Sequence, residues 1–252
     1  MSRLIDKFHQ ASKTAVPPMG FRTARPAAAA PKIILIASVE AVATGNPAEY
    51  LEGADAVLIG FDKIPPTAKA LQKITSALPD IPWGITGGQG EGADFVVFGA
   101  DSQITETPEG EKTGKILQVE SSMDDGLLRA VNDLPVDAVL ADDIFQDKES
   151  LVWHEMMIIQ HLANMFSKPL IIPAPAGITE KELKILWDAG VDGIMVEADA
   201  ARAEGFKDLR RAIDKLPARS GRKHGKVNMV LPRAAAETPA AAPPDEEEEE
   251  DE

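Results

Sequence analysis

The chain has 252 residues, of which 44% are hydrophobic and 5% aromatic, and it contains no cysteine. A chain of this length can bury a substantial core as one large domain with tails. The lack of cysteine excludes disulfide frameworks, thiolate nucleophiles and cysteine-ligated zinc, and it is typical of a reducing compartment. The N-terminus has no signal pattern and no apolar run is long enough to span a bilayer, so we expect a cytoplasmic protein without a membrane partner.

The net charge of the chain is −15, and the last eight residues, DEEEEEDE, supply eight of these negative charges. The rest of the chain is still acidic, and phosphate backbones repel an acidic surface. We therefore expect no nucleic-acid partner.

Both ends of the chain differ in composition from its centre. Residues 1–31 begin with an amphipathic stripe that contains Leu4, Ile5 and Phe8 and continue with a Pro/Ala-rich run, which predicts an N-terminal arm that docks on the body. Residues 233–252 are Ala/Pro-rich and then purely acidic, a composition that predicts a disordered tail. Residues 32–232 are left as the folded domain.

Eight short apolar runs follow the arm, and continuous runs of this length are typical of parallel strands that are buried on both faces. Segments with helical composition separate many of them, and this alternation predicts a (β/α)8 TIM barrel. The predicted strands are Lys32–Val39, Ala56–Phe61, Pro82–Thr86, Asp94–Phe98, Lys115–Glu120, Asp137–Asp142, Pro169–Ala174 and Gly193–Ala198. The predicted helices are Pro47–Glu52, Pro66–Leu78, Met123–Asn132, Lys148–Phe166, Glu180–Ala189 and Phe206–Leu216.

Four of these strands begin after a similar short phrase, and the phrase marks a corner of the repeating unit. The phrases are EGAD, ending at Asp55 and again at Asp94, LPVD, ending at Asp137, and AGVD, ending at Asp192. Glycine adopts a positive φ at little cost and often ends a helix. We interpret each phrase as the turn through which the chain enters the next strand.

Two connections are abbreviated. Only GGQGEGA, residues 87–93, separates the third and fourth strands, and the next connection, residues 100–114, lacks helical periodicity. One wall of the barrel would then have thin cover. We expect outward apolar side chains there, from Trp83, Phe95, Val97 and Ile116, to be covered by the N-terminal arm or by a second subunit.

The segment PLIIPAPAGITEKELKILWDAGVDGIMVEADA, Pro169–Ala200, resembles the last two βα units of phosphate-binding, aldolase-type barrels such as thiamine phosphate synthase and related synthases. The resemblance implies a ligand site after the seventh strand, where Gly177 and Ile178 match the second half of a Gly-Gly-Ile turn. The family's second glycine motif is replaced by Glu197-Ala198-Asp199, and carboxylates there would repel a phosphate dianion.

Active sites of such barrels lie at the carboxyl ends of the strands. In this chain those ends are largely acidic, which favours a cation, a shared proton or an amine-bearing ligand. We expect Glu120, Asp142 and Glu197 to act as acid, base or ligands, with Glu120 and Asp142 as the candidate ligands of Mg²⁺. The alternative is that these acids face solvent or cap helices. The residues at the ends are Glu40, Asp62, Thr86, Asp101, Glu120, Asp142, Asp143 and Glu197.

The glycine run that starts at Gly87 and Gly88 has two interpretations. It is a candidate ligand loop, but it lacks both the G-x-G-x-x-G spacing and the P-loop lysine. Close packing of the chain without a crossover helix explains the glycines better. Lys32, Lys115 and Lys168 lie at the starts of predicted strands, which argues against imine chemistry, and Lys63, just after the second strand, is interpreted as a solvated loop lysine or as a partner of nearby acids.

The predicted helix Lys148–Phe166 has more apolar residues than one buried stripe needs, which predicts a homo-oligomer or deep burial between neighbouring helices. The acidic tail needs no partner if it serves solubility, and its other candidate partners are the basic stretch Ala218–Lys226 or basic proteins.

Two functions remain open at this point. The first is an enzyme of the lyase, isomerase or synthase type that acts on a small oxygenated or phosphorylated metabolite. The second is a non-catalytic barrel that serves as a protein-interaction or scaffold module. Carboxylates that converge on one pocket would favour the enzyme.

Overall fold

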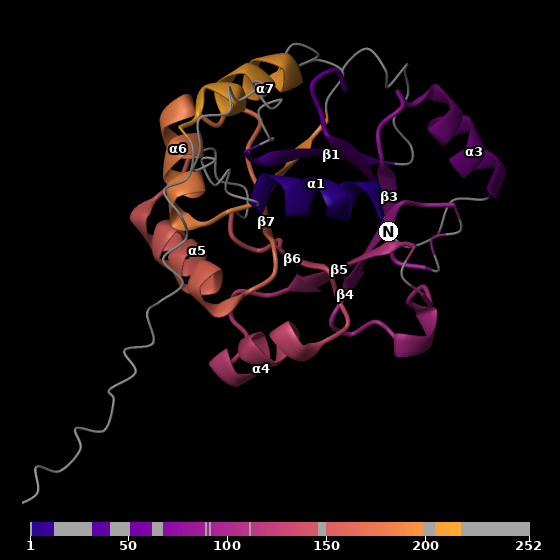
Figure 1. The fold of residues 1–252 in the computed structure, drawn as a ribbon, viewed down its shortest axis with the longest axis horizontal. Helices are drawn as coiled ribbons and strands as arrows, with labels where there is room; N and C mark the ends of the chain where they lie inside the picture. The colour runs from indigo at the N-terminus through magenta and orange to yellow at the C-terminus, as the bar shows by residue number, and fades with distance from the viewer. Residues whose placement is uncertain are drawn as a thin grey trace, which may run out of the picture. The chain divides into compact units, whose positions relative to one another are not determined.

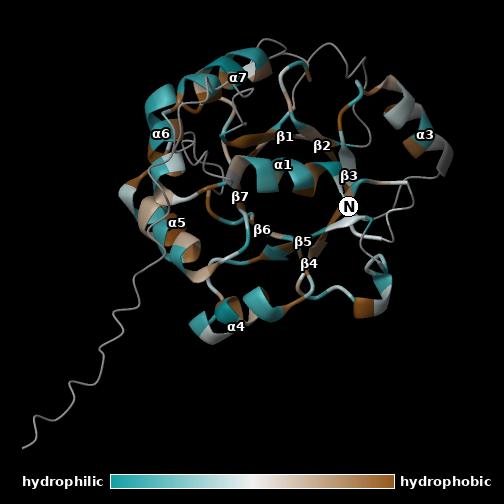
Figure 2. Cartoon of the chain, viewed as in Figure 1, coloured by the Kyte–Doolittle hydropathy of each residue, from teal (hydrophilic) through white to brown (hydrophobic). Residues whose placement is uncertain are grey.

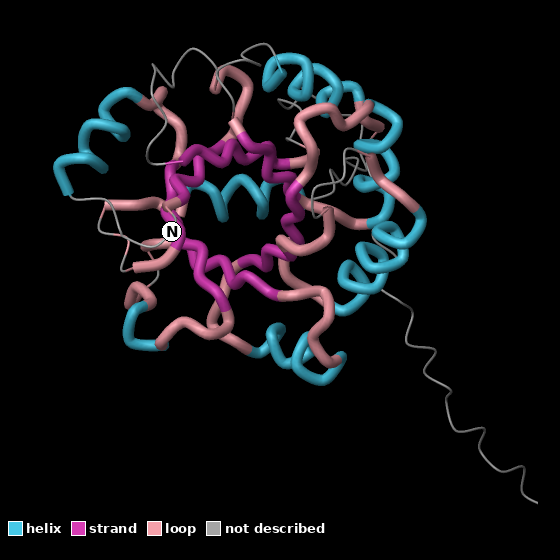
Figure 3. The backbone as a smooth tube through the Cα atoms, turned by 180° about the vertical axis from the view of Figure 1, so that it is seen from behind, coloured by secondary structure: helices cyan, strands magenta, loops and turns pink. Residues whose placement is uncertain are grey.

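A computed structural model describes residues 2–12, 32–40, 51–61, 68–88, 90, 92–110, 112–145, 150–198 and 205–217. Within them the strands form a closed barrel in chain order, and all neighbouring strands are parallel (Figures 1 and 3). The predicted (β/α)8 TIM barrel is confirmed. The strands are β1 (Ile34–Glu40), β2 (Ala56–Gly60), β3 (Trp83–Thr86), β4 (Phe95–Gly99), β5 (Gly114–Val119), β6 (Ala138–Ala141), β7 (Leu170–Pro173) and β8 (Gly193–Glu197).

Helices connect most strands of the ring and cover its outer face (Figure 3). The described helices are α1 (Arg3–Ser12), α3 (Ala68–Ala77), α4 (Asp125–Ala130), α5 (Trp153–Met165), α6 (Glu180–Ala189) and α7 (Gly205–Lys215), with 3-10 turns η1 (Ile104–Glu106) and η2 (Val131–Asp133). The predicted helix around residues 47–52, the basic stretch 218–226 and the tail 233–252 lie wholly or mainly outside the described residues. No helix of the described part is long and apolar enough to cross a membrane.

The strands bury both faces because each face meets its own apolar cluster. Leu35, Ala37 and Val39 of β1 belong to the cluster between the strands and the outer helices. Ile34 and Ile36 belong to a second cluster, which fills the inside of the barrel. Successive side chains of a strand point to opposite faces, so the two clusters follow directly from the pleat.

In β3, β4 and β5, where thin cover was expected, most of the side chains that were predicted to face outward point into the barrel instead. Phe95, Val97 and Ile116 point into the barrel and belong to the inner cluster, so their predicted outward orientation is wrong. Only Trp83 of the predicted set packs against the outer cluster. A continuously apolar strand carries no sequence signal for which residues face inward, and this explains the error.

The described residues of the glycine-rich connection between β3 and β4, 87–88, 90 and 92–93, contain no helix, as expected. Its backbone itself covers the outside of β4, because a Cβ on Gly90 would overlap the side chain of Val96. Gly90 has a φ of +60°, which glycine adopts without strain. The packing interpretation of the glycine run is therefore supported by this residue.

The N-terminal helix α1 closes one end of the barrel. Its apolar stripe, Leu4, Ile5 and Phe8, is almost fully buried and belongs to the same cluster as the inward side chains of the strands. Gly114 and Gly193, the first residues of β5 and β8, leave the space that Ile5 and Phe8 occupy. The helix therefore fills the amino-terminal end of the ring, where Figures 1 and 3 show it across the opening.

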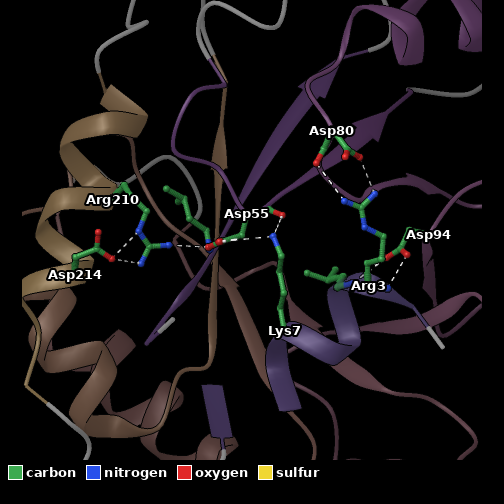
Figure 4. A network of polar contacts seen from close by, with 9 residues as sticks. Arg3, Lys7, Asp55, Asp80, Asp94, Arg210 and Asp214 are labelled. Carbon is green, nitrogen blue, oxygen red and sulfur yellow. Dashed lines mark hydrogen bonds and ion pairs between the residues drawn. The ribbon is translucent and has the colours of Figure 1, made fainter. Parts of the chain in front are cut away.

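Asp94 fixes the start of α1. Its carboxylate accepts hydrogen bonds from the Ser2 hydroxyl (2.7 Å), the Arg3 amide (2.7 Å) and the Leu4 amide (2.9 Å). The first amides of a helix have no partner within the helix, so a carboxylate there is stabilising. The Arg3 guanidinium also pairs with Asp80 at 3.1 Å (Figure 4).

Asp55 holds the other side of α1. The Lys7 ammonium donates to the Asp55 carbonyl (2.7 Å), and the Asp55 carboxylate accepts from Arg210 of α7 (2.8 Å; Figure 4). Burial lowers the pKa of Lys7, and the nearby Asp55 carboxylate opposes this shift. One acid therefore connects the first helix with the last described one.

The repeated phrases are strand-entry corners, and their aspartates have a shared structural role. Three of these aspartates donate their amide to the carbonyl of one residue on the preceding strand, and their carboxylate accepts that residue's amide. This pair of hydrogen bonds fixes the stagger of neighbouring strands. The pairs are Asp55 with Leu35, Asp137 with Lys115, and Asp192 with Leu170. The Asp94 amide donates a hydrogen bond to the Trp83 carbonyl in the same way, but the Asp94 carboxylate caps α1 instead of accepting the Trp83 amide.

We predict that Phe8→Ala lowers the free energy of unfolding by about 3–5 kcal/mol, because it leaves a cavity in the barrel interior. Urea unfolding followed by circular dichroism measures this change. Ile104→Ala is the matched control, since Ile104 is 89% exposed and its loss should change stability by less than about 0.5 kcal/mol. Equal small effects of the two substitutions would show that α1 is not part of the core.

Candidate functional site at the carboxyl ends of the strands

The end of the barrel opposite α1 carries polar side chains on its inner face. Paired residues of parallel strands share a face, and Leu140 of β6 lies in the inner cluster. Gln118 pairs with Leu140 and therefore points inward. Glu120 follows Gln118 by two residues and Asp142 follows Leu140 by two, so both lie on the same inner face. The inside of the ring changes from apolar to polar along these strands.

A cavity of about 990 Å³ opens at this end, beside β4, β5 and β6. Glu120 and Asp142, two of the three predicted catalytic residues, line it together. Its full lining is Gly99, Ala100, Asp101, Ser102, Gln118, Val119, Glu120, Ser122, Met123, Asp142 and Asp143. The cavity is therefore strongly acidic.

Asp142 is the half-buried carboxyl of this group. Burial raises its pKa, the hydrogen bond donated by the Gln118 amide lowers it, and the Asp143 and Glu120 carboxylates raise it again. The net direction is upward. A carboxyl with a raised pKa can hold a proton and donate it to a bound molecule, which is the property of a general acid.

Asp143 has a structural role next to it. Its carboxylate accepts hydrogen bonds from the Ser121 amide (2.9 Å) and hydroxyl (2.8 Å), and so holds the turn after β5. The Ser122 hydroxyl lies 3.4 Å from the Glu120 carboxylate. These contacts place Glu120, which is exposed, at the edge of the cavity.

Glu197, the third predicted catalytic residue, is not brought to this cavity. It ends β8, is exposed, and is paired in register with Ser38 of β1. Strand β7 separates it from Asp142. Glu40 is likewise exposed at the end of β1, and Asp62 lies outside the described residues.

Gln118 is a cavity residue that sequence reasoning missed. It stands two positions before Glu120 in KILQVE, so both side chains lie on the same face of this segment. A polar residue near the carboxyl end of a largely apolar strand is the signal that could have indicated it.

No group of three or more His, Asp or Glu side chains with metal-binding geometry occurs among the residues described here. The predicted Mg²⁺ ligands Glu120 and Asp142 supply two carboxylates to one cavity. Mg²⁺ keeps several of its waters in protein sites, so two carboxylates fit its chemistry. Its binding at this cavity stays a prediction.

The predicted ligand glycines lie elsewhere at the same end of the strands. Gly87 and Gly88 directly follow β3 with φ of +71° and +70°, and no other atom lies within 4 Å of where a Cβ would be. Gly177 has the same open space in the turn after β7, while Ile178 is buried. Their contact with a ligand is untested.

The N-terminus of α6, which follows Gly177 and Ile178, is already capped by the chain itself. Thr179 and Glu182 form a reciprocal capping box, and the Glu182 carboxylate also accepts the Leu151 amide at 3.0 Å. Burial raises the pKa of Glu182, but the hydrogen bonds from Thr179 and Leu151 outweigh it and lower the pKa. This carboxylate occupies the position where a helix would attract a phosphate.

No protein-family model matches the chain, and no curated protein matches it in sequence. Among solved structures it is similar to a thiamine phosphate pyrophosphorylase from Pyrococcus furiosus, with 16% identity and a TM-score of 0.53 over 73% of this chain and 96% of that one. It is also similar to a mutant tryptophan synthase alpha-subunit from the same organism, with 13% identity and a TM-score of 0.50 over 72% and 96%. These likenesses agree with the (β/α)8 barrel fold.

We predict that the pKa of Asp142, measured by NMR titration of its carboxyl carbon, lies above the ordinary aspartate value. Gln118→Ala should raise it further, since the hydrogen bond favours the ionised form, and Glu120→Gln should lower it. A lower pKa in Gln118→Ala, or a higher pKa in Glu120→Gln, would contradict the assignment of these causes.

The raised pKa has a consequence for stability. The folded state binds more protons than the unfolded state between the unfolded and folded pKa values, so stability falls as pH rises through that interval. We predict that Asp142→Asn increases the melting temperature at pH 7 and not at pH 3. Thermal unfolding at both pH values measures this, and an equal change at the two would contradict it.

We also predict that Glu182→Ala lowers stability by about 1–2 kcal/mol at pH 7, because it leaves the start of α6 and the Leu151 amide without their acceptor. The effect should be lost as the pH falls through the lowered pKa of Glu182. Glu180→Ala, at an exposed position of the same helical turn, is the control for urea unfolding.

Proposed function

We propose that this protein is an enzyme of the lyase, isomerase or synthase type that acts on a small oxygenated or phosphorylated metabolite. One observation carries the proposal: Asp142, a carboxyl of raised pKa, and Glu120 line one large cavity at the end of the barrel opposite α1. Pairs of acids with different environments can divide the tasks of proton donor and proton acceptor.

In this mechanism Asp142 donates a proton to an oxygen of the bound substrate, and Glu120 accepts a proton from an adjacent carbon or hydroxyl. Gln118 orients the Asp142 carboxyl through its amide hydrogen bond. The proton that the substrate receives from Asp142 and the proton that it gives to Glu120 balance, and proton exchange with water returns both carboxyls to their starting states, so an isomerisation needs no further reactant.

The charges of the cavity determine how a substrate would lie. Hydroxyl or amine groups fit the acidic pair, whereas a phosphate would be repelled by it. A phosphorylated substrate would place its phosphate toward the open glycines Gly87, Gly88 or Gly177, which the chain leaves without covering atoms. Backbone amides at such glycines can approach phosphate oxygens closely.

A divalent cation is the other way to occupy the acidic pair. Mg²⁺ held by Glu120 and Asp142 would favour the ionised form of Asp142 and would lower its pKa, so cation binding and proton donation by Asp142 exclude each other. The cation would then polarise a substrate oxygen in place of the proton.

A thermal-shift screen of the intact chain with Mg²⁺ and with phosphorylated sugars and acids tests the proposal. A ligand at 100 times its Kd stabilises the folded state by about 2.7 kcal/mol, or roughly 5–10 °C for a chain of this size. We expect this shift in the unmodified chain and its loss in Asp142→Asn and Glu120→Gln. Glu106→Gln, at an exposed site outside the cavity, should keep it.

A non-catalytic interaction module is the second candidate. Glu120 and Glu197 are exposed, as side chains for recognition of a cationic partner would be. Two results of the thermal-shift screen would favour this second function. One is a melting-temperature shift that persists in Asp142→Asn, and the other is the absence of a shift with Mg²⁺ and with every metabolite.

A further inference from the structure

An apolar surface remains exposed where α5 and α6 begin. Trp153 is 84% exposed, Met157 70%, Val152 45% and Ile185 36%. We call these four residues the α5–α6 face. They are four of the seven large hydrophobic side chains that the described residues expose. Their concentration at one place separates them from the scattered apolar residues of an ordinary surface.

The exposed side of α5 lacks charge. Its polar exposed residues are His154, Gln160, His161 and Asn164, and its one acidic residue, Glu155, is buried and accepts the Val152 amide. Charged residues make up 27% of the whole chain. Loss of charge together with exposed Trp and Met is the composition of a protein interface core. Figure 2 shows the stronger hydrophobic colour of α5 beside α6 and α7.

A cavity of about 530 Å³ lies directly beside Trp153. It is lined by Leu151, Val152, Trp153, Met156, Thr179, Lys181, Glu182 and Ile185. The surface therefore combines a protruding indole with an apolar hollow large enough for another indole. A pairing about a two-fold axis requires both features on one surface, because each copy presents the same residues.

Two hydrogen bonds hold the backbone beside the hollow. The Glu182 carboxylate of α6 accepts the Leu151 amide at 3.0 Å, and Val152 donates its amide to Glu155 at 2.6 Å. A backbone that is already hydrogen-bonded loses less freedom when a partner binds, so more of the contact energy contributes to affinity.

We propose that the α5–α6 face is the contact between two copies of this chain, with Trp153 of each copy in the hollow of the other. The chain carries a net charge of −15, so two copies repel each other least at a surface without excess negative charge. At this face the exposed side of α5 has no charged residue, and the charges of Lys181 and Glu182 beside the hollow are opposite. A basic partner would instead select the acidic surfaces. This inference is independent of the proposed enzymatic function.

The area agrees with a small dimer. A Trp side chain buries on the order of 150–250 Å², and Met157, Val152 and Ile185 add smaller areas in line with their exposure. The four residues together then supply roughly half of the 800 Å² or so per partner that a standard interface buries. The polar residues of α5 around them, His154 and Gln160 among others, supply the rim.

Sedimentation velocity of the full chain tests the proposal. We expect a mass of twice 26.9 kDa at micromolar concentrations, and a dissociation constant raised about 30-fold or more by Trp153→Glu. A glutamate suits the first turn of a helix, so the variant should fold. Ile104→Glu adds the same charge at an 89% exposed apolar residue elsewhere and should leave the dimer unchanged.

A monomeric unmodified chain, a dimer that persists in Trp153→Glu, or an equal loss of the dimer in Ile104→Glu would each overturn the proposal. Cross-linking gives an independent readout, because the chain has no cysteine. Gln160→Cys should form a covalent dimer with a short bis-maleimide, and Ser102→Cys, which lies at the β4 end, should not. The reverse result would place the contact elsewhere.

Discussion

The packing of one apolar helical stripe into the amino-terminal end of the strand ring is the interaction on which the rest of the structure depends. Leu4, Ile5 and Phe8 complete a cluster to which most of the strands contribute. A closed ring of parallel strands has two ends, and α1 excludes water from one of them. Polar side chains can therefore reach the inside only from the other end, and this is where Gln118, Glu120 and Asp142 converge.

The aspartates at the strand entries keep this ring in register although one connection has no helix. Asp55, Asp137 and Asp192 each exchange two hydrogen bonds with one residue of the preceding strand. At the connection without a helix, Asp94 directs its carboxylate to α1 instead. The wall of the barrel at this connection is therefore hydrogen-bonded to the helix that fills the interior.

The sequence allowed the barrel, the number and order of its strands and the corner phrases to be predicted, because apolar runs and turn residues are local signals. It did not allow inward and outward residues of β4 and β5 to be distinguished, since Phe95 and Val97 stand in a run without alternation. The sequence predicted that α1 docks through Leu4, Ile5 and Phe8. An amphipathic stripe does not show which surface it will contact, so the barrel interior was not predicted as its place. Glu120, Asp142 and Glu197 were predicted as one site because all three stand at carboxyl ends of strands. The neighbouring strands β5 and β6 bring Glu120 and Asp142 to one cavity, whereas Glu197 ends β8, beyond β7. Gln118 carried a sequence signal as a polar residue in a largely apolar strand, but its contact with Asp142 depends on the register of β5 and β6, which the sequence does not give.

Hydrogen exchange of α1 tests the central claim most directly, since it reports whether the helix opens independently of the barrel. If α1 is part of the core, amides of its second half, such as that of Phe8, should exchange with opening free energies close to those of Ile36 in β1. The denaturant dependence of their exchange should also match that of global unfolding. Exchange of the α1 amides near the rate of a free peptide, with Ile36 still protected, would contradict the account.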